Sequence, residues 1–324
     1  MDFQRRQGLL AAAALLAVGA SSTARAQGAF PNRPVKIVVP FLAGGSVDPV
    51  ARLLGEKLSA IWGQAVIVDN KPGASTIIGT DAVAKAAPDG YTILLTANTH
   101  VSNPMLFNNL PFDSIADFTP IVPVNTAEFV LTTYPSFKAN TLREAVAEIK
   151  ANPGKFTYAS AGVGNIVHLG MELFQMLTGT KLLHVPYKGA NQILPDLVSG
   201  QVQFYLSVPV TVIPYLQSGK IKALATTARL PAMPTVPTFA EAGMPEFTLR
   251  SWLGFLAPAK TPRDIVNKLN ADISRVLQMP DVREKLISQG QNPWILSPEE
   301  FGAAMRKDAA EYARVIKAAN IKLE

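Results

Sequence analysis

The chain has 324 residues, of which 48% are hydrophobic and 17% charged, and its formal net charge is +6. This length suits two domains rather than one, and the apolar share excludes global disorder. Because the chain has no cysteine, disulfides, thiolate metal sites and thiol nucleophiles are excluded. Three histidines are too few for a multi-histidine metal site to be expected. The basic residues are scattered, which argues against nucleic-acid binding.

Residues 1–26 have the features of a cleavable secretory signal. A pair of arginines stands near the start, residues 9–20 form an apolar run, and Ala24-Arg25-Ala26 fits the small-x-small cleavage rule. The run is too short to span a bilayer, which takes about 20 residues. We therefore expect cleavage after Ala26 and export, with the ordinary Sec route favoured over the Tat route because Gln7-Gly8 fits the twin-arginine motif poorly. A buried N-terminal helix is the alternative.

The first part of the remaining chain alternates predicted strands and helices. Short β-branched runs predict strands at residues 35–41, 65–69 and 91–97. A helix is expected to open with Asp48 as its N-cap and Pro49 at its first position, and another to cover residues 76–86. This alternation predicts a parallel sheet with helices on both faces.

The same alternation recurs farther along the chain. Strands are predicted at 129–133, 156–160, 181–186, 202–207 and 221–226, and helices at 141–151, 166–177, 191–199 and 209–218. The helix at 141 has a capping box, Thr141 with Glu144. A proline-rich excursion (229–245), a buried strand beginning at Trp252 and helices at 262–277, 281–289 and 298–319 complete the chain.

These elements predict an α/β protein of two lobes, each a mostly parallel sheet flanked by helices. We expect residues 27–124 and 229–324 to form lobe 1 and residues 125–228 to form lobe 2. The cleft between two such lobes is a preferred place for a ligand.

Two glycine-rich loops, one in each predicted lobe, are the strongest candidates for ligand binding. Each joins a strand to a helix, where glycines allow close approach of the backbone and the free N–H groups of the first helical turn favour an anion. A tight strand–helix turn without function is the alternative for each, and Asp48 is favoured as a helix cap over a ligand contact. The candidate residues are Phe41, Gly44, Gly45, Ser46 and Asp48 in the first loop, and Ser160, Ala161, Gly162, Gly164 and Asn165 in the second.

Two more loops follow strands of the first sheet and are expected to face the same cleft. Their candidate residues are Asn70, Gly73, Ala74, Ser75, Thr96, Asn98 and Thr99. His100 could line the cleft, whereas His184 is expected in the core.

Evidence for an enzyme is thin. The sequence has no Gly-x-Ser-x-Gly elbow, His-Glu-x-x-His motif or P-loop. The spacing of Ser160 and His168 is poor for activating a nucleophile, and position 167 is Val where a dinucleotide fingerprint needs glycine. We expect no catalytic residue, no metal and no cofactor. A secreted hydrolase that uses Ser160 or Ser46 remains as an alternative.

Ordered sequence blocks along the mature chain resemble the Bug-type extracytoplasmic solute receptors of tripartite tricarboxylate transporters. The blocks are Pro31-Asn32-Arg33-Pro34-Val35-Lys36-Ile37-Val38-Val39-Pro40-Phe41, Gly44-Gly45-x-x-Asp48, Asn70-Lys71-Pro72-Gly73-Ala74, Pro88-Asp89-Gly90-Tyr91, Asn103-Pro104, Leu110-Pro111-Phe112-Asp113, Asp117-Phe118-Thr119-Pro120-Ile121, His184-Val185-Pro186-Tyr187-Lys188-Gly189, Pro237-Thr238-Phe239-Ala240-Glu241-Ala242-Gly243 and Ser251-Trp252.

The resemblance implies a monomeric periplasmic binding protein of the Venus-flytrap kind (type II) that closes on a small carboxylate, such as a di- or tricarboxylate or an aromatic acid. It implies that backbone N–H groups and water at both glycine loops hold the ligand, and that membrane permease subunits receive it. Ser207 stands at a strand end where the family often has aspartate, so a ligand with an amine is not expected. A sensory role that signals to a kinase would use the same fold and remains as an alternative.

Overall fold

The computed structural model describes residues 30–45, 47–187 and 190–321. Its contacts divide the chain into two units, Met1–Asn32 and Arg33–Glu324, and all helices and strands described below belong to the second unit. The predicted signal peptide and Ser46 lie outside the described residues.

The first sheet has six strands and is mixed. Its order is β11 (Gln291–Pro293), β4 (Phe118–Ala127), β10 (Ser251–Pro258), β3 (Thr92–Ala97), β1 (Val35–Val39) and β2 (Val66–Asn70). β1 pairs in parallel with β2 and β3, whereas β10 runs antiparallel to both β3 and β4. Four of the five residues of β1 are buried, which explains why this strand is a nearly continuous apolar run.

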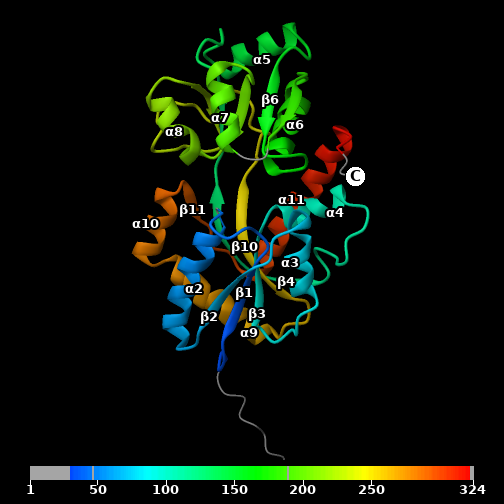
Figure 1. The fold of residues 1–324 in the computed structure, drawn as a ribbon, viewed down its shortest axis with the longest axis vertical. Helices are drawn as coiled ribbons and strands as arrows, with labels where there is room; N and C mark the ends of the chain where they lie inside the picture. Colours follow the sequence, from blue (N-terminus) through cyan, green and yellow to red (C-terminus); the bar gives the residue numbers. More distant parts are fainter. Residues whose placement is uncertain (1–29, 46, 188–189, 322–324) are drawn as a thin grey trace, which may run out of the picture. The chain divides into compact units, whose positions relative to one another are not determined.

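The second sheet has five strands, in the order β7 (Leu183–Pro186), β6 (Thr157–Ser160), β8 (Phe204–Ser207), β5 (Val130–Thr133) and β9 (Lys222–Thr226). Its helices are α5 (Leu142–Ala151), α6 (Ile166–Thr178), α7 (Ala190–Ser199) and α8 (Pro209–Gln217). Figure 1 shows these helices, in green, grouped around β6. The two-sheet α/β architecture is therefore confirmed.

The expectation of mostly parallel sheets is wrong in its proportion. The parallel trios β2-β1-β3 and β7-β6-β8 are present, but β4, β10, β5 and β9 add antiparallel pairings to them. The difference lies mainly in β4, a ten-residue strand in a region where the sequence analysis predicted no strand. Pro120 and Pro123 of β4 pair with β10 next to register shifts, where a strand tolerates proline.

Several further helices belong to the region of the first sheet. They are α2 (Asp48–Trp62), η1 (Ala74–Thr76), α3 (Ile77–Ala84), α4 (Thr99–Leu106), α9 (Arg263–Leu277), α10 (Pro280–Ser288) and α11 (Pro298–Ala318). The three predicted C-terminal helices are thus confirmed. Strands of this sheet contact α2, α3, α9 and α11. α11 begins with a capping box between Ser297 and Glu300, and it packs against both β4 and α6.

The helix starts confirm one predicted cap and correct another. The Thr141 hydroxyl accepts a hydrogen bond from the Glu144 N–H, as expected for an N-cap. Asp48, in contrast, is the first residue of α2 and does not cap it. Its carboxylate instead accepts hydrogen bonds from the Gly44 N–H and from Arg52.

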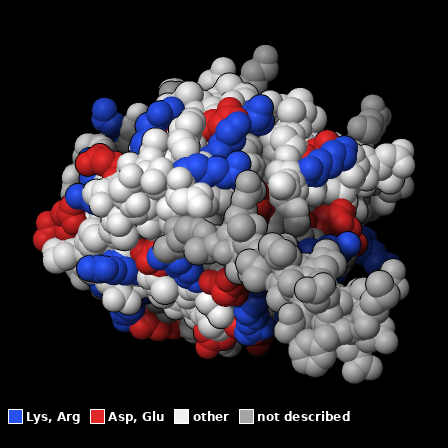
Figure 2. Space-filling model, turned by 90° about the horizontal axis from the view of Figure 1, so that it is seen from below, with Lys and Arg blue, Asp and Glu red and all other residues white. Residues whose placement is uncertain are grey.

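Charges are interspersed on the face shown in Figure 2, where basic and acidic side chains alternate with neutral surface. Scattered surface charge is typical of a protein that does not bind nucleic acid. Among the described residues, no helix is long and apolar enough to cross a membrane.

Candidate functional site

Loops that follow β1, β2, β3 and β6 surround a cavity of about 560 Å³. Cavities of this size hold small metabolites. The lining comes from both sheets, since residues 161–165 follow β6 of the second sheet and all other lining residues follow strands of the first. The lining residues are Pro40, Phe41, Leu42, Gly45, Val47, Pro72, Gly73, Ser75, Thr76, Thr99, Asn103, Leu106, Ala161, Gly162, Val163, Gly164 and Asn165.

The N-termini of four helices reach this cavity. Val47, Thr76 and Asn165 are the N-caps of α2, α3 and α6, and Thr99 is the first residue of α4. The first N–H groups of a helix have no acceptor within the helix and carry its positive dipole end. Four such ends around one cavity favour an anion.

Among the described residues, no charged side chain lines the cavity. Its polar side chains are hydroxyls and amides, and the Oγ1 of Thr99 is buried without a hydrogen-bond partner. The remainder of the lining is apolar. The cavity therefore offers an anion dipoles and hydroxyl groups rather than a salt bridge.

The first glycine loop (residues 41–47) is held by its own hydrogen bonds. The Gly44 N–H donates to Asp48 Oδ2 over 2.9 Å, and the Gly45 N–H donates to the Leu42 carbonyl over 3.2 Å. Arg52 Nε donates to the same oxygen of Asp48 over 3.0 Å, and this hydrogen bond lowers the pKa of Asp48. The two glycine N–H groups thus shape the loop and are not free for a ligand in this conformation.

Residues 73–76 are a strained segment, of which Gly73, Ser75 and Thr76 line the cavity. Gly73 has a φ of 128°, and Ala74, Ser75 and Thr76 have φ values of 44°, 51° and 78°, which non-glycine residues rarely adopt. Asn103 from α4 fixes this segment, since its Nδ2 donates to the Ser75 carbonyl over 2.7 Å. Strained backbone that neighbouring groups hold in place often marks a functional site.

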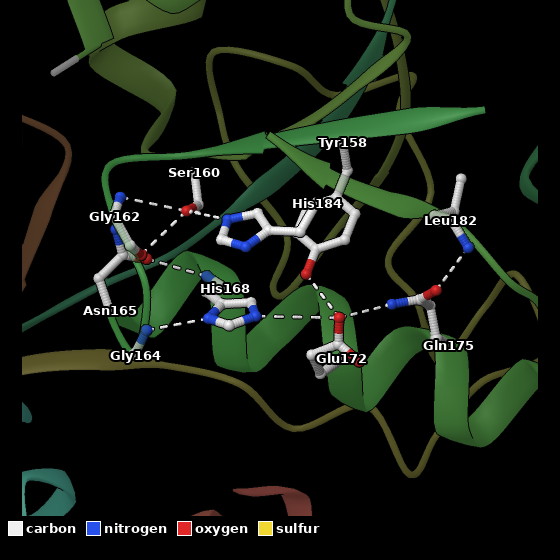
Figure 3. Close-up of polar contacts among 10 residues, drawn as sticks. All are labelled: Tyr158, Ser160, Gly162, Gly164, Asn165, His168, Glu172, Gln175, Leu182 and His184. Carbon is white, nitrogen blue, oxygen red and sulfur yellow. Dashed lines mark hydrogen bonds and ion pairs between the residues drawn. The ribbon is translucent and has the colours of Figure 1, made fainter. Parts of the chain in front are cut away.

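The second glycine loop (residues 161–165) is held by buried side chains beneath it (Figure 3). The Gly162 N–H donates to Ser160 Oγ over 3.2 Å, and the Gly164 N–H donates to Nδ1 of His168 over 2.9 Å. Asn165 caps α6 by accepting from the His168 N–H. As in the first loop, the glycine N–H groups serve the loop itself.

The structure brings nine of the predicted site residues to the cavity. They are Phe41, Gly45, Gly73, Ser75, Thr99, Ala161, Gly162, Gly164 and Asn165. Asn98 lines a smaller cavity of about 100 Å³ that shares Thr99 and Asn165 with the first. Its side chain accepts from the Trp252 N–H and donates to the Tyr312 hydroxyl.

Seven other predicted residues do not line the cavity. Asn70 supports the first glycine loop by donating to the Phe41 carbonyl. Thr96 and Ser207 are buried, with hydroxyl groups that have no partner. The full set is Gly44, Asp48, Asn70, Ala74, Thr96, Ser160 and Ser207.

The sequence analysis missed eight lining residues, which are Pro40, Leu42, Val47, Pro72, Thr76, Asn103, Leu106 and Val163. Asn103 lies on α4, a helix that was not predicted because Pro104 interrupts its pattern. The Asn103-Pro104 block was the one signal available for it.

The histidines differ from expectation in two cases. His100 is fully buried and its Nε2 lies 2.7 Å from the Ser114 carbonyl, away from the cavity, and burial lowers its pKa to about 4. His184 is only partly buried and its Nε2 lies 2.6 Å from Ser160 Oγ. Ser160 therefore pairs with His184 rather than with His168.

Two α/β sheets with a cavity between their loops define a two-lobed solute-binding protein. The comparison with protein families agrees, because residues 50–321 match the model of the tripartite tricarboxylate transporter family receptors. The chain belongs to this family.

Solved structures of similar proteins support the same assignment. The periplasmic binding protein BugD is 34% identical and has a TM-score of 0.73, with 91% of this chain and 100% of that one covered. Rpa4515 of R. palustris, solved with adipate, is 32% identical with a TM-score of 0.77 and the same coverage. MatC from Rhodopseudomonas palustris, with bound malate, is 33% identical with a TM-score of 0.73, covering 89% of this chain and 100% of that one.

Proposed function

We propose that the protein is a periplasmic receptor that binds a small carboxylate in the 560 Å³ cavity and delivers it to membrane permease subunits. The observation that carries this proposal is the convergence of four helix N-termini on a cavity without charged side chains among its described lining residues. Such a site can bind a carboxylate through N–H groups and hydroxyls alone. The adipate and malate bound by two similar proteins support the choice of a carboxylate.

The lining also favours carboxylates with an apolar body. Phe41, Leu42, Val47, Leu106 and Val163 provide apolar surface, and none of the described lining residues has an acidic side chain that could pair with an ammonium group. A short aliphatic or aromatic acid fits this lining better than an amino acid. The ligand would be trapped by hinge closure of the two lobes, with boundaries near residues 124 and 229.

The proposal is tested by a thermal-shift screen of residues 27–324 with mono-, di- and tricarboxylates and aromatic acids. A ligand at about 100 times its Kd adds about 2.7 kcal/mol of stability, which raises the Tm by several degrees in a protein of this size. The screen is repeated after unfolding and refolding, which removes any ligand retained from expression. Absence of a shift with every acid in the refolded protein would contradict the proposal.

The short contact between Ser160 and His184 is the observation that favours a hydrolase as second candidate. Ser160 is, however, fully buried and does not line the cavity, so a substrate in the cavity does not reach its hydroxyl. We therefore expect no labelling by a fluorophosphonate serine probe. Labelling that the Ser160→Ala variant loses would establish the hydrolase instead.

A further inference from the structure

A largely buried polar network lies directly beneath the second glycine loop. It joins β6, α6 and β7 through Tyr158, Ser160, His168, Glu172 and His184 (Figure 3). The two imidazole rings stack with their centroids 4.0 Å apart and nearly parallel. None of the five side chains lines the cavity, so the network acts on a ligand only through the loop above it.

The hydrogen bond from Gly164 defines the protonation state of His168. Its Nδ1 accepts from the Gly164 N–H over 2.9 Å, so the proton of the neutral ring sits on Nε2. Nε2 lies 3.9 Å from Oε1 of Glu172, and the same oxygen accepts from the Tyr158 hydroxyl and from Gln175. A proton added to Nδ1 would place two donors against each other and break the bond to Gly164.

The surroundings keep His168 neutral in the folded protein. Burial lowers the pKa of His168 to about 3, with a further contribution from His184, and burial lowers the pKa of His184 to about 4. The titratable groups that face His168 are His184 of β7, Tyr158 of β6 and Glu172 of its own helix. Burial raises the pKa of Glu172, so this carboxyl favours the protonated form more than an ordinary one does.

We infer that His168 is a positioning residue of the binding cavity, whose neutral ring holds Gly164 in place and whose protonation releases the second glycine loop. The inference rests on the proposed function, because only a ligand in the cavity gives the position of this loop a functional consequence. Val163 and Gly164, on either side of the held peptide, both line the cavity. Release of the loop therefore removes one wall of the cavity. Because protonation of His168 releases the loop, the affinity for a carboxylate should fall as the pH is lowered.

The expected size of the effect follows from linkage. A histidine that has an ordinary pKa of about 6.5 in the released loop and a pKa of about 3 in the held loop favours release about 30-fold more at pH 5 than at pH 7.5. Hydrogen exchange of the Gly164 amide in the protein without ligand measures this opening directly, once corrected for the intrinsic effect of pH.

Two variants separate positioning from mere packing. His168→Gln supplies an amide oxygen that can accept from Gly164 and does not titrate, whereas His168→Phe supplies no acceptor. We expect His168→Phe to expose the Gly164 amide at every pH and to weaken adipate binding at least tenfold. His168→Gln should keep the affinity within a few-fold at pH 7.5 and lose the extra opening at pH 5. His100→Gln, at a buried histidine away from the cavity, is the control and should retain the wild-type pH response of Gly164 exchange and of adipate affinity.

The outcomes distinguish this inference from the proposed function. Adipate titrates in the same pH range, so only the difference in pH response between wild type and His168→Gln is used. If adipate binds but His168→Phe binds it as tightly as wild type, the inference is overturned and the receptor function stands. If adipate does not bind, hydrogen exchange of the Gly164 amide alone tests the inference. Equal protection of this amide in wild type and in His168→Phe would then overturn it.

Discussion

The two glycine loops face one cavity but are held by different chemistry. In the first loop, the Gly44 N–H bonds to the charged carboxylate of Asp48, whose partner Arg52 has a side chain 56% exposed. In the second, the Gly164 N–H bonds to the neutral ring of His168, which is buried. A backbone N–H can thus be fixed by a carboxylate paired with an exposed arginine or by a buried neutral acceptor. The first should respond to salt and the second to protons.

The largest expected effect is a loss of stability in mild acid. The pKa of His100, His168 and His184 is lowered to about 4, 3 and 4 in the folded chain. The unfolded chain therefore binds more protons below about pH 6.5, and the free energy of unfolding falls as pH falls. Between pH 7 and pH 5 the loss is up to about 2 kcal/mol per histidine. Urea unfolding at stepped pH values measures it.

A flat stability profile between pH 7 and pH 5 would contradict this assignment of neutral, buried histidines. His100→Gln should remove about a third of the slope, because the other two histidines remain. The pKa of Glu172 is raised in the folded chain, so protonation of this carboxyl stabilises the folded state. At lower pH it therefore reduces the net dependence of the free energy of unfolding on pH.

Alanine substitution of one glycine in each loop gives the next largest effect. Gly162 has a φ of 124°, whereas Gly44 has a φ of 76°, close to the left-handed helical region, and an added Cβ meets no atom within 4 Å at either position. Backbone strain alone should therefore cost about 1–3 kcal/mol for Gly162→Ala and about 1 kcal/mol for Gly44→Ala. Gly162→Ala should also weaken carboxylate binding more than Gly44→Ala does.

Gly219→Ala is the matched control, since Gly219 has a φ of 67° and also has open space around its Cβ. It should cost about 1 kcal/mol and leave affinity unchanged. Denaturant unfolding and calorimetry measure the two quantities. Equal loss of affinity in all three variants would show that the loops have no special relation to the ligand.

Removing the charge of the first loop should have a smaller effect. Asp48→Asn keeps an acceptor for Gly44 but loses the ion pair with Arg52, whose guanidinium is exposed, so that the pair is worth about 0.5 kcal/mol. We expect a few-fold weaker affinity and a smaller dependence of affinity on salt than in wild type. Asp281→Asn, which breaks an exposed pair with Lys57 away from the cavity, should change neither. An unaltered salt response in Asp48→Asn would refute the contrast between the loops.

The smallest effect is expected at the apolar rim of the cavity. Leu42 and Val163 line the cavity from opposite loops and are 71% and 39% exposed. Leu42→Ser and Val163→Ser should change the free energy of unfolding by less than about 0.5 kcal/mol. They should weaken the binding of acids with an apolar body a few-fold. Ile287→Ser, at a residue 53% exposed on α10, is the control. Unchanged binding in both rim variants would exclude a role for apolar contacts.

Local sequence patterns predicted most of the fold. Apolar runs such as that of β1 and capping residues such as Thr141 act within a few residues, so their consequences are visible in the sequence. β4 was missed because proline is tolerated in a strand only at irregular pairing. The register shifts that accommodate Pro120 and Pro123 arise from pairing with β10, a strand more than a hundred residues farther along the chain.

The sequence analysis predicted the location of the site but not the hydrogen bonds that hold its loops. Glycines between a strand and a helix marked both loops, but the bonds that occupy their N–H groups depend on side chains brought in by folding. Ser160 meets His184 because β6 and β7 pair in parallel, with Tyr158 opposite His184. No spacing rule along the chain reveals a partner that a neighbouring strand supplies.

The most direct test of the central claim compares a carboxylate with its neutral amide. Calorimetry of refolded residues 27–324 is carried out with the best acid from the thermal-shift screen and with the corresponding amide, at pH 7.5. Because helix N-termini and hydroxyls are assigned to the anion, the acid should bind at least tenfold more tightly. Equal affinity for acid and amide, or no binding of either, would contradict the account.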